Sequence, residues 1–263
     1  MYLLGISAKV ARTILSVIVF GVCSMGAKAD DAAGRDIVLV HGAWVGEWYW
    51  SDLVAILKSA GHRPHAVSLK GHGQRRAEGG PKVSIADHAA DIISAVEQLK
   101  MEDIILVGHS YGGRPLTAAW DTLREEIAHV VYVESVAPVN DDSIAIPKDH
   151  KSMRFIMERY PALVEQGMLP VPARLKQSYS QVLASQSIKS VYGEVTLGSG
   201  PLPDTPGTYV VGKESKSKIF RSYGKHLEIW RGWNFTEISG GHSLAGVGMR
   251  DLADVLQGIA EGR

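Results

Sequence analysis

The segment Gly108-His109-Ser110-Tyr111-Gly112 contains the residue best suited to act as a nucleophile. It follows the apolar run 104–107 directly, precedes a helical pattern and matches the motif G-x-S-x-G. Glycines on both sides permit a tight turn from strand to helix, which strains the serine backbone and presents its hydroxyl above a sheet. The helix that begins there favours negative charge at its N-terminus. The pattern therefore predicts that Ser110 attacks a substrate, the alternative being an ordinary glycine-rich turn.

A serine hydroxyl is a weak nucleophile at neutral pH and needs a base, usually a histidine that a carboxylate orients. His242 lies in the loop Ser239-Gly240-Gly241-His242-Ser243, after the last expected strand and before the last expected helix. A loop histidine that follows the serine in the chain fits the order serine, acid, histidine. We therefore expect His242 to be the base rather than a solvated loop residue.

Negative charge that develops on a substrate oxygen requires backbone N–H donors aimed at it. The turn His41-Gly42-Ala43-Trp44 follows the first apolar run, 37–40, where such an oxyanion hole is usually built. We expect the backbone amides of Ala43 and Tyr111 to be the two donors. Trp44 begins a stretch rich in aromatic residues, and we expect it to contact the ligand, the alternative being core packing under the first helix.

The elements that must position these residues are β-branched apolar runs that alternate with helical patterns from residue 36 onward. Strands are expected at 37–40, 66–69, 104–107, 130–133, 209–211 and 234–238, and helices at 50–60, 84–100, after Ser110 and at 250–259. Strands that are apolar on both faces predict a parallel sheet covered by helices on either side, which is an α/β fold. Residues from about 138 to 206 break this rhythm with methionines and prolines and no clear strand. We expect them to form a cap insertion over the carboxyl edge of the sheet rather than a second domain.

The first 29 residues have the order of an export signal. Basic residues precede an apolar run at 13–23 that is too short to span a bilayer comfortably, and Ala27-Lys28-Ala29 is a cleavage pattern. Cleavage would leave residues 30–263 as one domain, periplasmic or secreted, with no membrane anchor. It would also remove Cys23, the one cysteine of the chain, so that neither a disulfide nor a thiolate metal site could form.

Composition limits the class of protein and its partners. The chain has 263 residues, of which 45% are hydrophobic, and this composition is typical of a globular domain and excludes a disordered or coiled-coil chain. The 28 basic residues balance the 28 acidic ones, and cleavage of the signal would leave 25 basic residues, for a net charge of −3. Because no polybasic run exists to bind phosphates, we expect no nucleic acid, and the expected partner is a small molecule.

HGAW after the first strand, GHSYGG at the turn and SGGHS near the end together resemble the α/β-hydrolase superfamily. The resemblance covers about residues 36–259 and is closest to the branch of small esterases and hydroxynitrile lyases. It implies an eight-stranded, mostly parallel sheet, a small cap and no cofactor, and we expect no metal. The lyases resemble one another in a threonine at the second place of the oxyanion turn and a lysine immediately after the histidine. These positions are Gly42 and Ser243 here, which favours ester hydrolysis.

The resemblance fails at the third catalytic residue, the acid that orients the histidine. The family usually places an aspartate a few residues beyond the strand 209–211, and a gap-free match falls on Ser215, which carries no charge. Glu214 is adjacent, but it is equally compatible with a solvated charge among lysines. Glu134 directly follows the strand 130–133, where an unpaired carboxylate would be costly, and some dehalogenases of this fold resemble it in drawing their acid from there. We favour Glu134 over Glu214.

These patterns predict a serine hydrolase that cleaves a small carboxylic ester or lactone through an acyl-enzyme on Ser110. Two alternatives stay open at this point. One is a protein that binds a small ligand on the hydrolase fold without turnover, since the acid is displaced from its usual place. The other, less favoured, is a lyase of the hydroxynitrile-lyase type, which cleaves a carbon–carbon bond.

Overall fold

The computed structural model describes residues 34–140, 158, 161–193 and 197–263, which all belong to the unit formed by residues 33–263. The expected export signal, residues 1–29, lies outside the described residues, as do parts of the expected cap. Within the described residues, no helix is both long enough and apolar enough to cross a membrane.

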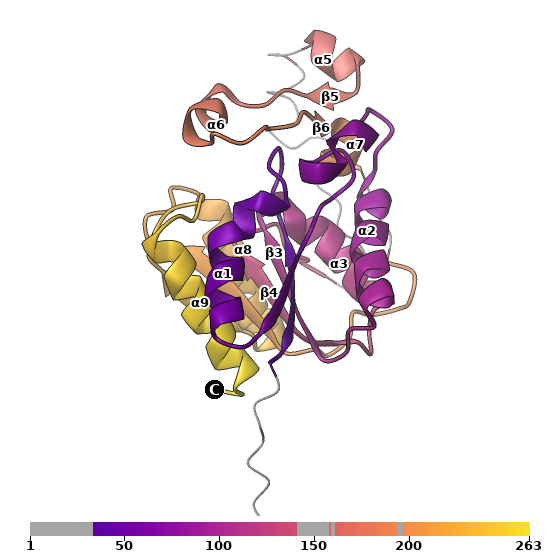
Figure 1. Ribbon diagram of the computed structural model, residues 1–263. Helices are drawn as coiled ribbons and strands as arrows, with labels where there is room; N and C mark the ends of the chain where they lie inside the picture. Colours follow the sequence, from indigo (N-terminus) through magenta and orange to yellow (C-terminus); the bar gives the residue numbers. More distant parts are fainter. Residues whose placement is uncertain (1–33, 141–157, 159–160, 194–196) are drawn as a thin grey trace, which may run out of the picture. The chain divides into compact units, whose positions relative to one another are not determined.

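Six parallel strands form the main sheet (Figure 1). In the order of the sheet they are β2 (Arg63–Val67), β1 (Asp36–Val40), β3 (Ile104–His109), β4 (Ile127–Val133), β7 (Gly207–Gly212) and β8 (Asn234–Ile238). Val40 lies beside Gly108, and His109 lies beside Val133. The carboxyl ends of β1, β3 and β4 therefore meet at one edge of the sheet. This register brings the residues that follow these strands, His41, Ser110 and Glu134, to the same edge.

The number of strands differs from the eight that the resemblance implies. The described chain enters the sheet at Asp36, and helix α9 (Val247–Ala260) is the only element after β8. The other two strands of the described residues, β5 (Met168–Leu169) and β6 (Gln186–Ser187), pair with each other and do not join the main sheet. The expectation of a mostly parallel sheet flanked by helices is confirmed, with six strands in its described part.

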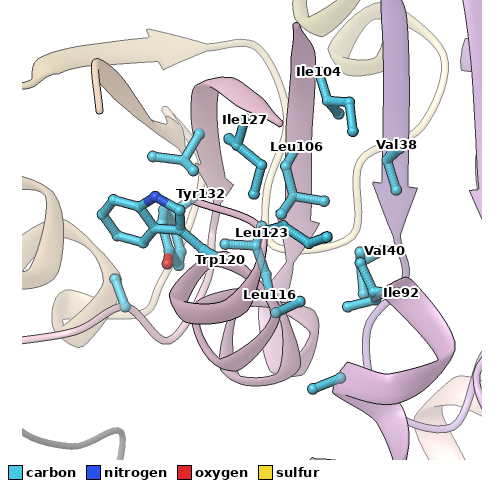
Figure 2. Packing of buried hydrophobic residues seen from close by; sticks show 14 of the residues in the cluster. Val38, Val40, Ile92, Ile104, Leu106, Leu116, Trp120, Leu123, Ile127 and Tyr132 are labelled. Atoms are coloured by element: carbon cyan, nitrogen blue, oxygen red, sulfur yellow. The ribbon is translucent and has the colours of Figure 1, made fainter. Parts of the chain in front are cut away.

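Helices cover both faces of the main sheet because each strand is apolar on both sides. Helices α2 (Ile85–Leu99), α3 (Gly113–Thr122) and α8 (Lys218–Arg231) cover one face, and α1 (Ser51–Ser59) and α9 cover the other. In β1, Val38 and Val40 join the first core cluster, whereas Ile37 and Leu39 join the second. Figure 2 shows the first cluster, in which side chains from the strands meet the helical residues Ile92, Leu116 and Trp120.

Two elements differ from the sequence patterns. Strand β2 occupies Arg63–Val67 rather than 66–69, and it lies at the edge of the sheet, where Pro64 and a charged neighbour are tolerated. Helix α8 was not expected from the sequence. Its many charged residues make the apolar face, which includes the buried Leu227, difficult to recognise. Short 3-10 helices lie at Glu47–Trp50 (η1), Gly73–Glu78 (η2) and Ser110–Gly112 (η3).

The described part of the expected cap segment contains the helices α5 (Pro161–Glu165), α6 (Ala173–Ser178) and α7 (Ile188–Tyr192) in addition to β5 and β6. The sequence of this segment shows no clear strand, and each of the two strands found there has only two residues. Two hydrogen bonds join this segment to the carboxyl edge of the main sheet. The Ala184 amide donates to the carbonyl of Trp44, and the guanidinium of Arg114 donates to the carbonyl of Gly193.

Candidate active site

The turn after β3 holds Ser110 in a backbone conformation that non-glycine residues rarely adopt. Its φ is 54°, in the left-handed region, and the chain then passes through η3 into α3. The glycine at position 112 is required by a close approach, because a Cβ atom there would lie 2.6 Å from the carbonyl oxygen of His41. The hydroxyl of Ser135 donates to the Ser110 carbonyl over 2.7 Å. The expected strand–turn–helix arrangement is present, and Ser110 lines a cavity of about 180 Å³.

His242 lies in the loop between β8 and α9 and lines the same cavity as Ser110. Its Nδ1 lies 3.3 Å from Oε2 of Glu134. Because a carboxylate only accepts hydrogen bonds, Nδ1 is the donor, and Nε2 is the ring nitrogen that can take a proton. The imidazole stacks on the ring of Phe220, with centroids 5.0 Å apart and an interplanar angle of 6°.

Glu134 is fully buried directly after β4, with a φ of 46°. Its Oε1 accepts a hydrogen bond from the Gly212 amide at 2.8 Å, and its Oε2 accepts one from the Ser215 hydroxyl at 2.7 Å in addition to the contact with His242. These donors compensate for the burial of a carboxylate. Ser215, the position at which the family usually has an aspartate, therefore contacts the glutamate that lies beside the histidine.

Glu214 is placed differently. Its side chain is exposed, and its Oε2 accepts a hydrogen bond from the backbone amide of Gly240. The structure thus brings Glu134, and not Glu214, to the imidazole of His242. The distinction could not be read from spacing, since it depends on where the ends of β4 and β7 lie relative to the loop of His242.

The turn after β1 packs directly against Ser110. A Cβ atom on Gly42 would lie 3.2 Å from the Cβ of Ser110. Ala43 and Trp44 line the cavity with Ser110. Trp44 itself has a φ of 67°, and both of its backbone groups are bound by the cap: its amide donates to Oε1 of Gln186 at 3.4 Å, and its carbonyl accepts from the Ala184 amide at 3.0 Å.

Tyr111, the residue after Ser110, is held by its buried side chain. Its hydroxyl donates to Nδ1 of His88 at 2.7 Å, because Nε2 of His88 already donates to the carbonyl of Lys70 at 2.9 Å. His41, in the oxyanion turn, is fully buried, and its Nε2 accepts from the Leu69 amide at 3.3 Å. The hydrogen-bonded side chains of Tyr111 and His41 therefore fix the two backbone segments from which oxyanion donors are expected, one at residue 111 and the other in the turn 41–44.

Buried histidines surround the site and are held in the neutral form. Burial lowers the pKa of His109 to about 3, with a further contribution from His242, and it lowers the pKa of His88 to about 4, with a further contribution from His72. Burial also lowers the pKa of His72, and it lowers that of His41 well below its usual value. These four histidines are therefore uncharged at neutral pH.

The cavity is lined mainly by apolar groups. Val45, Leu175 and Tyr179 line it together with the residues of the oxyanion turn, and Arg174 of α6 adds one cationic side chain. The sequence patterns missed the cap residues of this lining, because the contribution of the cap depends on its conformation. They also missed His109, although its place inside the G-x-S-x-G motif is a usable signal. Among the described residues no cluster of side chains is suited to bind a metal ion.

The sequence also matches known proteins. The profile of the alpha/beta hydrolase family matches residues 37–255. A carbendazim hydrolyzing esterase from a Nocardioides species is 28% identical over 240 residues, which cover 85% of this chain and 99% of that protein. The rice esterase PIR7B (Oryza sativa subsp. japonica) is 24% identical over 263 aligned positions, which cover 88% of this chain and 97% of that protein.

Solved structures share the fold. An extracellular alpha/beta-hydrolase from a Paenibacillus species superimposes with a TM-score of 0.71 at 20% identity, over 84% of this chain and 97% of that one. Polyneuridine aldehyde esterase superimposes with a TM-score of 0.62 at 19% identity, over 86% of this chain and 99% of that one. The parallel sheet, the strained serine after β3 and the match over residues 37–255 lead to one assignment. This chain belongs to the alpha/beta hydrolase family.

Proposed function

We propose that this protein is a serine carboxylic ester hydrolase that cleaves a small ester or lactone through an acyl-enzyme on Ser110. One observation carries the proposal: a serine with a φ of 54° and a histidine bonded to a fully buried carboxylate line the same cavity. The esterases among the relatives, including the carbendazim hydrolyzing esterase, support hydrolysis of an ester-like bond.

The reaction follows from the positions of these groups. The Ser110 hydroxyl attacks the carbonyl carbon while Nε2 of His242 takes its proton, and Glu134 stabilises the imidazolium that forms. The amides of Ala43 and Tyr111 donate to the oxyanion. His242 then returns the proton to the alcohol that leaves, and water, activated by the same histidine, cleaves the acyl-enzyme to a carboxylic acid.

The cavity favours a small substrate. Its volume of about 180 Å³ is below the usual range for drug-sized ligands, roughly 300–1,000 Å³. Its walls combine apolar side chains with the aromatic rings of Trp44 and Tyr179, which suit an apolar acyl or alcohol group. We propose that Trp44 contacts this group.

Three residues weigh against the two alternatives. The ligand-binding alternative rests on the displaced acid, and the contact of the Glu134 carboxylate with His242 at 3.3 Å weighs against it. The lyase alternative requires a threonine in place of Gly42, where even a Cβ atom would lie 3.1 Å from Nδ1 of His109. Ser243 stands at the position of the lysine of the lyases and lines the cavity without a charge.

Labelling of Ser110 and ester turnover test the proposal together. The purified protein is treated with a fluorophosphonate, and the adduct is located by mass spectrometry of peptides, while p-nitrophenyl acetate hydrolysis is followed for an initial burst. We expect an adduct on Ser110 and steady turnover, both lost in Ser110→Ala. An unlabelled Ser110 together with no turnover of p-nitrophenyl acetate, p-nitrophenyl butyrate or a γ-lactone would exclude the hydrolase and favour a binding protein.

We also propose that the chain is exported and acts in the periplasm or outside the cell. The support is the order of basic, apolar and small residues over residues 1–29. N-terminal sequencing of the protein secreted by an expression host is expected to give Asp30 as the first residue. An intact N-terminus in the cytoplasmic fraction would refute export.

A further inference from the structure

We propose that His109 and Tyr49 are positioning residues that hold the loop of the catalytic base in place. The inference rests on the proposed function, because it assigns to His242 the role of base. It concerns two buried polar side chains for which the described residues show no hydrogen bond to Glu134 or to the amides of Ala43 and Tyr111. Both bind backbone groups of the loop that carries His242.

His109 is the last residue of β3 and directly precedes the nucleophile. Its Nε2 lies 2.8 Å from the carbonyl oxygen of His242, so Nε2 carries the proton and donates it to this carbonyl. The side chain is 4% exposed. Residue 109 therefore places the serine through the main chain and the base through its side chain.

Tyr49, in η1, binds the same loop two residues further on. Its hydroxyl oxygen accepts a hydrogen bond from the Leu244 amide at 3.2 Å. Its ring stacks on that of His109, with centroids 4.8 Å apart and an interplanar angle of 14°. The two side chains therefore support each other and hold the loop at two backbone groups, the carbonyl of His242 and the amide of Leu244.

The protonation of His109 keeps this arrangement constant. Because burial lowers its pKa to about 3, the ring is neutral throughout the pH range in which an esterase is assayed. A neutral imidazole carries one proton, which Nε2 uses for the carbonyl of His242. Nδ1 is buried against Gly42 and has no hydrogen-bond partner among the residues that the structure describes. A substitution that moves the donor to the Nδ1 position would therefore lose the contact.

Other contacts fix the start of the loop, where the Ser239 amide donates to Asp251 and Gly240 is hydrogen-bonded to Glu214, whereas His109 and Tyr49 bind the backbone groups next to the His242 side chain. Gly240, with a φ of 97°, and Gly241 precede His242, and glycines give a chain more conformational freedom than any other residue. The imidazole meets Glu134 at 3.3 Å, which is long for a charge-assisted bond. Displacement of a catalytic group by 1 Å can lower the reaction rate by about 10²-fold. We therefore expect the two hydrogen bonds to the loop to affect kcat.

The side-chain amides of glutamine and asparagine separate the role of the donor from that of packing. In His109→Gln the amide takes the place of Nε2, whereas in His109→Asn it takes the place of Nδ1. With active sites counted by fluorophosphonate labelling, we expect kcat for p-nitrophenyl acetate to fall about 10- to 100-fold in His109→Asn, with KM unchanged. We expect His109→Gln to stay within about threefold of the wild type. Tyr49→Phe keeps the stacked ring but removes the acceptor of the Leu244 amide and the contact of the Tyr49 hydroxyl with Nε2 of His109 at 3.4 Å, and kcat is expected to fall about 3- to 10-fold.

His129 supplies a matched control. It is half-buried in β4, and its Nε2 is hydrogen-bonded to the Thr208 hydroxyl at 3.0 Å, near the opposite end of the sheet from the site. His129→Leu removes one histidine hydrogen bond, as His109→Asn does, and is expected to lower the melting temperature without changing kcat per site.

Each outcome decides the inference. A kcat equal to that of the wild type in His109→Asn, or equal losses in the Asn and Gln variants, would overturn the role of the Nε2 donor. If His109→Asn does not fold, Tyr49→Phe decides instead, and an unchanged kcat there overturns the inference. A wild-type protein that neither labels at Ser110 nor turns over any ester overturns the proposed function, which is distinct from a wild type that is active and insensitive to these changes.

Discussion

Replacing Glu134 by glutamine is expected to lower kcat by about 10²- to 10³-fold. The carboxylate lies 3.3 Å from Nδ1 of His242, and at an effective dielectric constant of about 20 Coulomb's law gives about 5 kcal/mol for its attraction to the imidazolium. The His242 side chain is 39% exposed, so that water screens part of this energy and leaves about 3 to 4 kcal/mol. Each 1.4 kcal/mol of lost transition-state stabilisation costs about a factor of ten in rate. KM should change little, because the imidazolium forms only after the substrate has bound.

The assay is the steady-state hydrolysis of p-nitrophenyl acetate by folded protein, with circular dichroism as the check on folding. Glu214→Gln is the matched control, since Glu214 is exposed and bonds Gly240 instead of the base. We expect less than about a twofold effect there. A Glu134→Gln variant that keeps more than about a tenth of the wild-type kcat, or a Glu214→Gln variant that loses as much activity, would refute the assignment of the acid.

A second substitution tests the same geometry in the opposite direction. The Ser215 hydroxyl lies 2.7 Å from Oε2 of Glu134, so a carboxylate introduced at position 215 would lie close to the present position of that oxygen. We expect kcat of the double variant Glu134→Gln/Ser215→Asp to be at least about tenfold higher than kcat of Glu134→Gln alone, because the base regains a charged partner. The single change Ser215→Asp places two carboxylates side by side and is expected to lower activity. A double variant no more active than Glu134→Gln would contradict the geometry.

Three further outcomes follow from other parts of the molecule. Gly113→Ala would place a Cβ atom 2.1 Å from a backbone carbonyl oxygen, and we expect it to reduce soluble expression or the melting temperature strongly; a stable, active variant would be contrary evidence. The native-state pKa values of about 4 for His88 and about 3 for His109 lie below the ordinary value of about 6.5, so the unfolded chain binds more protons as the pH falls below 6.5. The free energy of unfolding in urea should therefore decrease by about 2 kcal/mol for each of these histidines between pH 7.5 and 5, and a flat pH dependence would refute this account. Arg174→Gln is expected to lower kcat/KM about 5- to 10-fold for a monoanionic ester such as methyl succinate but not for methyl butyrate, since this residue adds the cation of the cavity lining; equal effects on both esters would exclude a charge effect.

The sequence patterns predict the main sheet well where apolar runs are continuous. The run at 37–40 becomes β1, and its residues alternate between the two core clusters, as the expectation of a sheet buried on both sides requires. Strand β2 is harder to delimit, because an edge strand accepts Arg63 and Pro64, which a central strand would not. The membership of the alpha/beta hydrolase family, inferred from three short motifs, is confirmed.

The site is predictable only in part, for a physical reason. Ser110 can be located because its strained turn requires glycines beside it, and glycines are visible in a sequence. The choice between Glu134 and Glu214 depends on the distance from each carboxylate to His242, which is a property of folded loops. Gln186 could not be recognised, since it belongs to the cap and reaches the oxyanion turn across 142 residues of sequence.

The double hydrogen bonding of Trp44 to Gln186 and Ala184 constrains how this enzyme could be re-engineered. A chimera that exchanges residues 161–193 for the cap of another hydrolase would remove both partners of a residue whose φ is 67°. An exchange of caps to alter substrate range would then also relax the main chain next to Ala43. The cap segment and the turn after β1 therefore have to be exchanged together. A foreign cap is compatible only if it supplies an acceptor for the amide of residue 44 and a donor for its carbonyl.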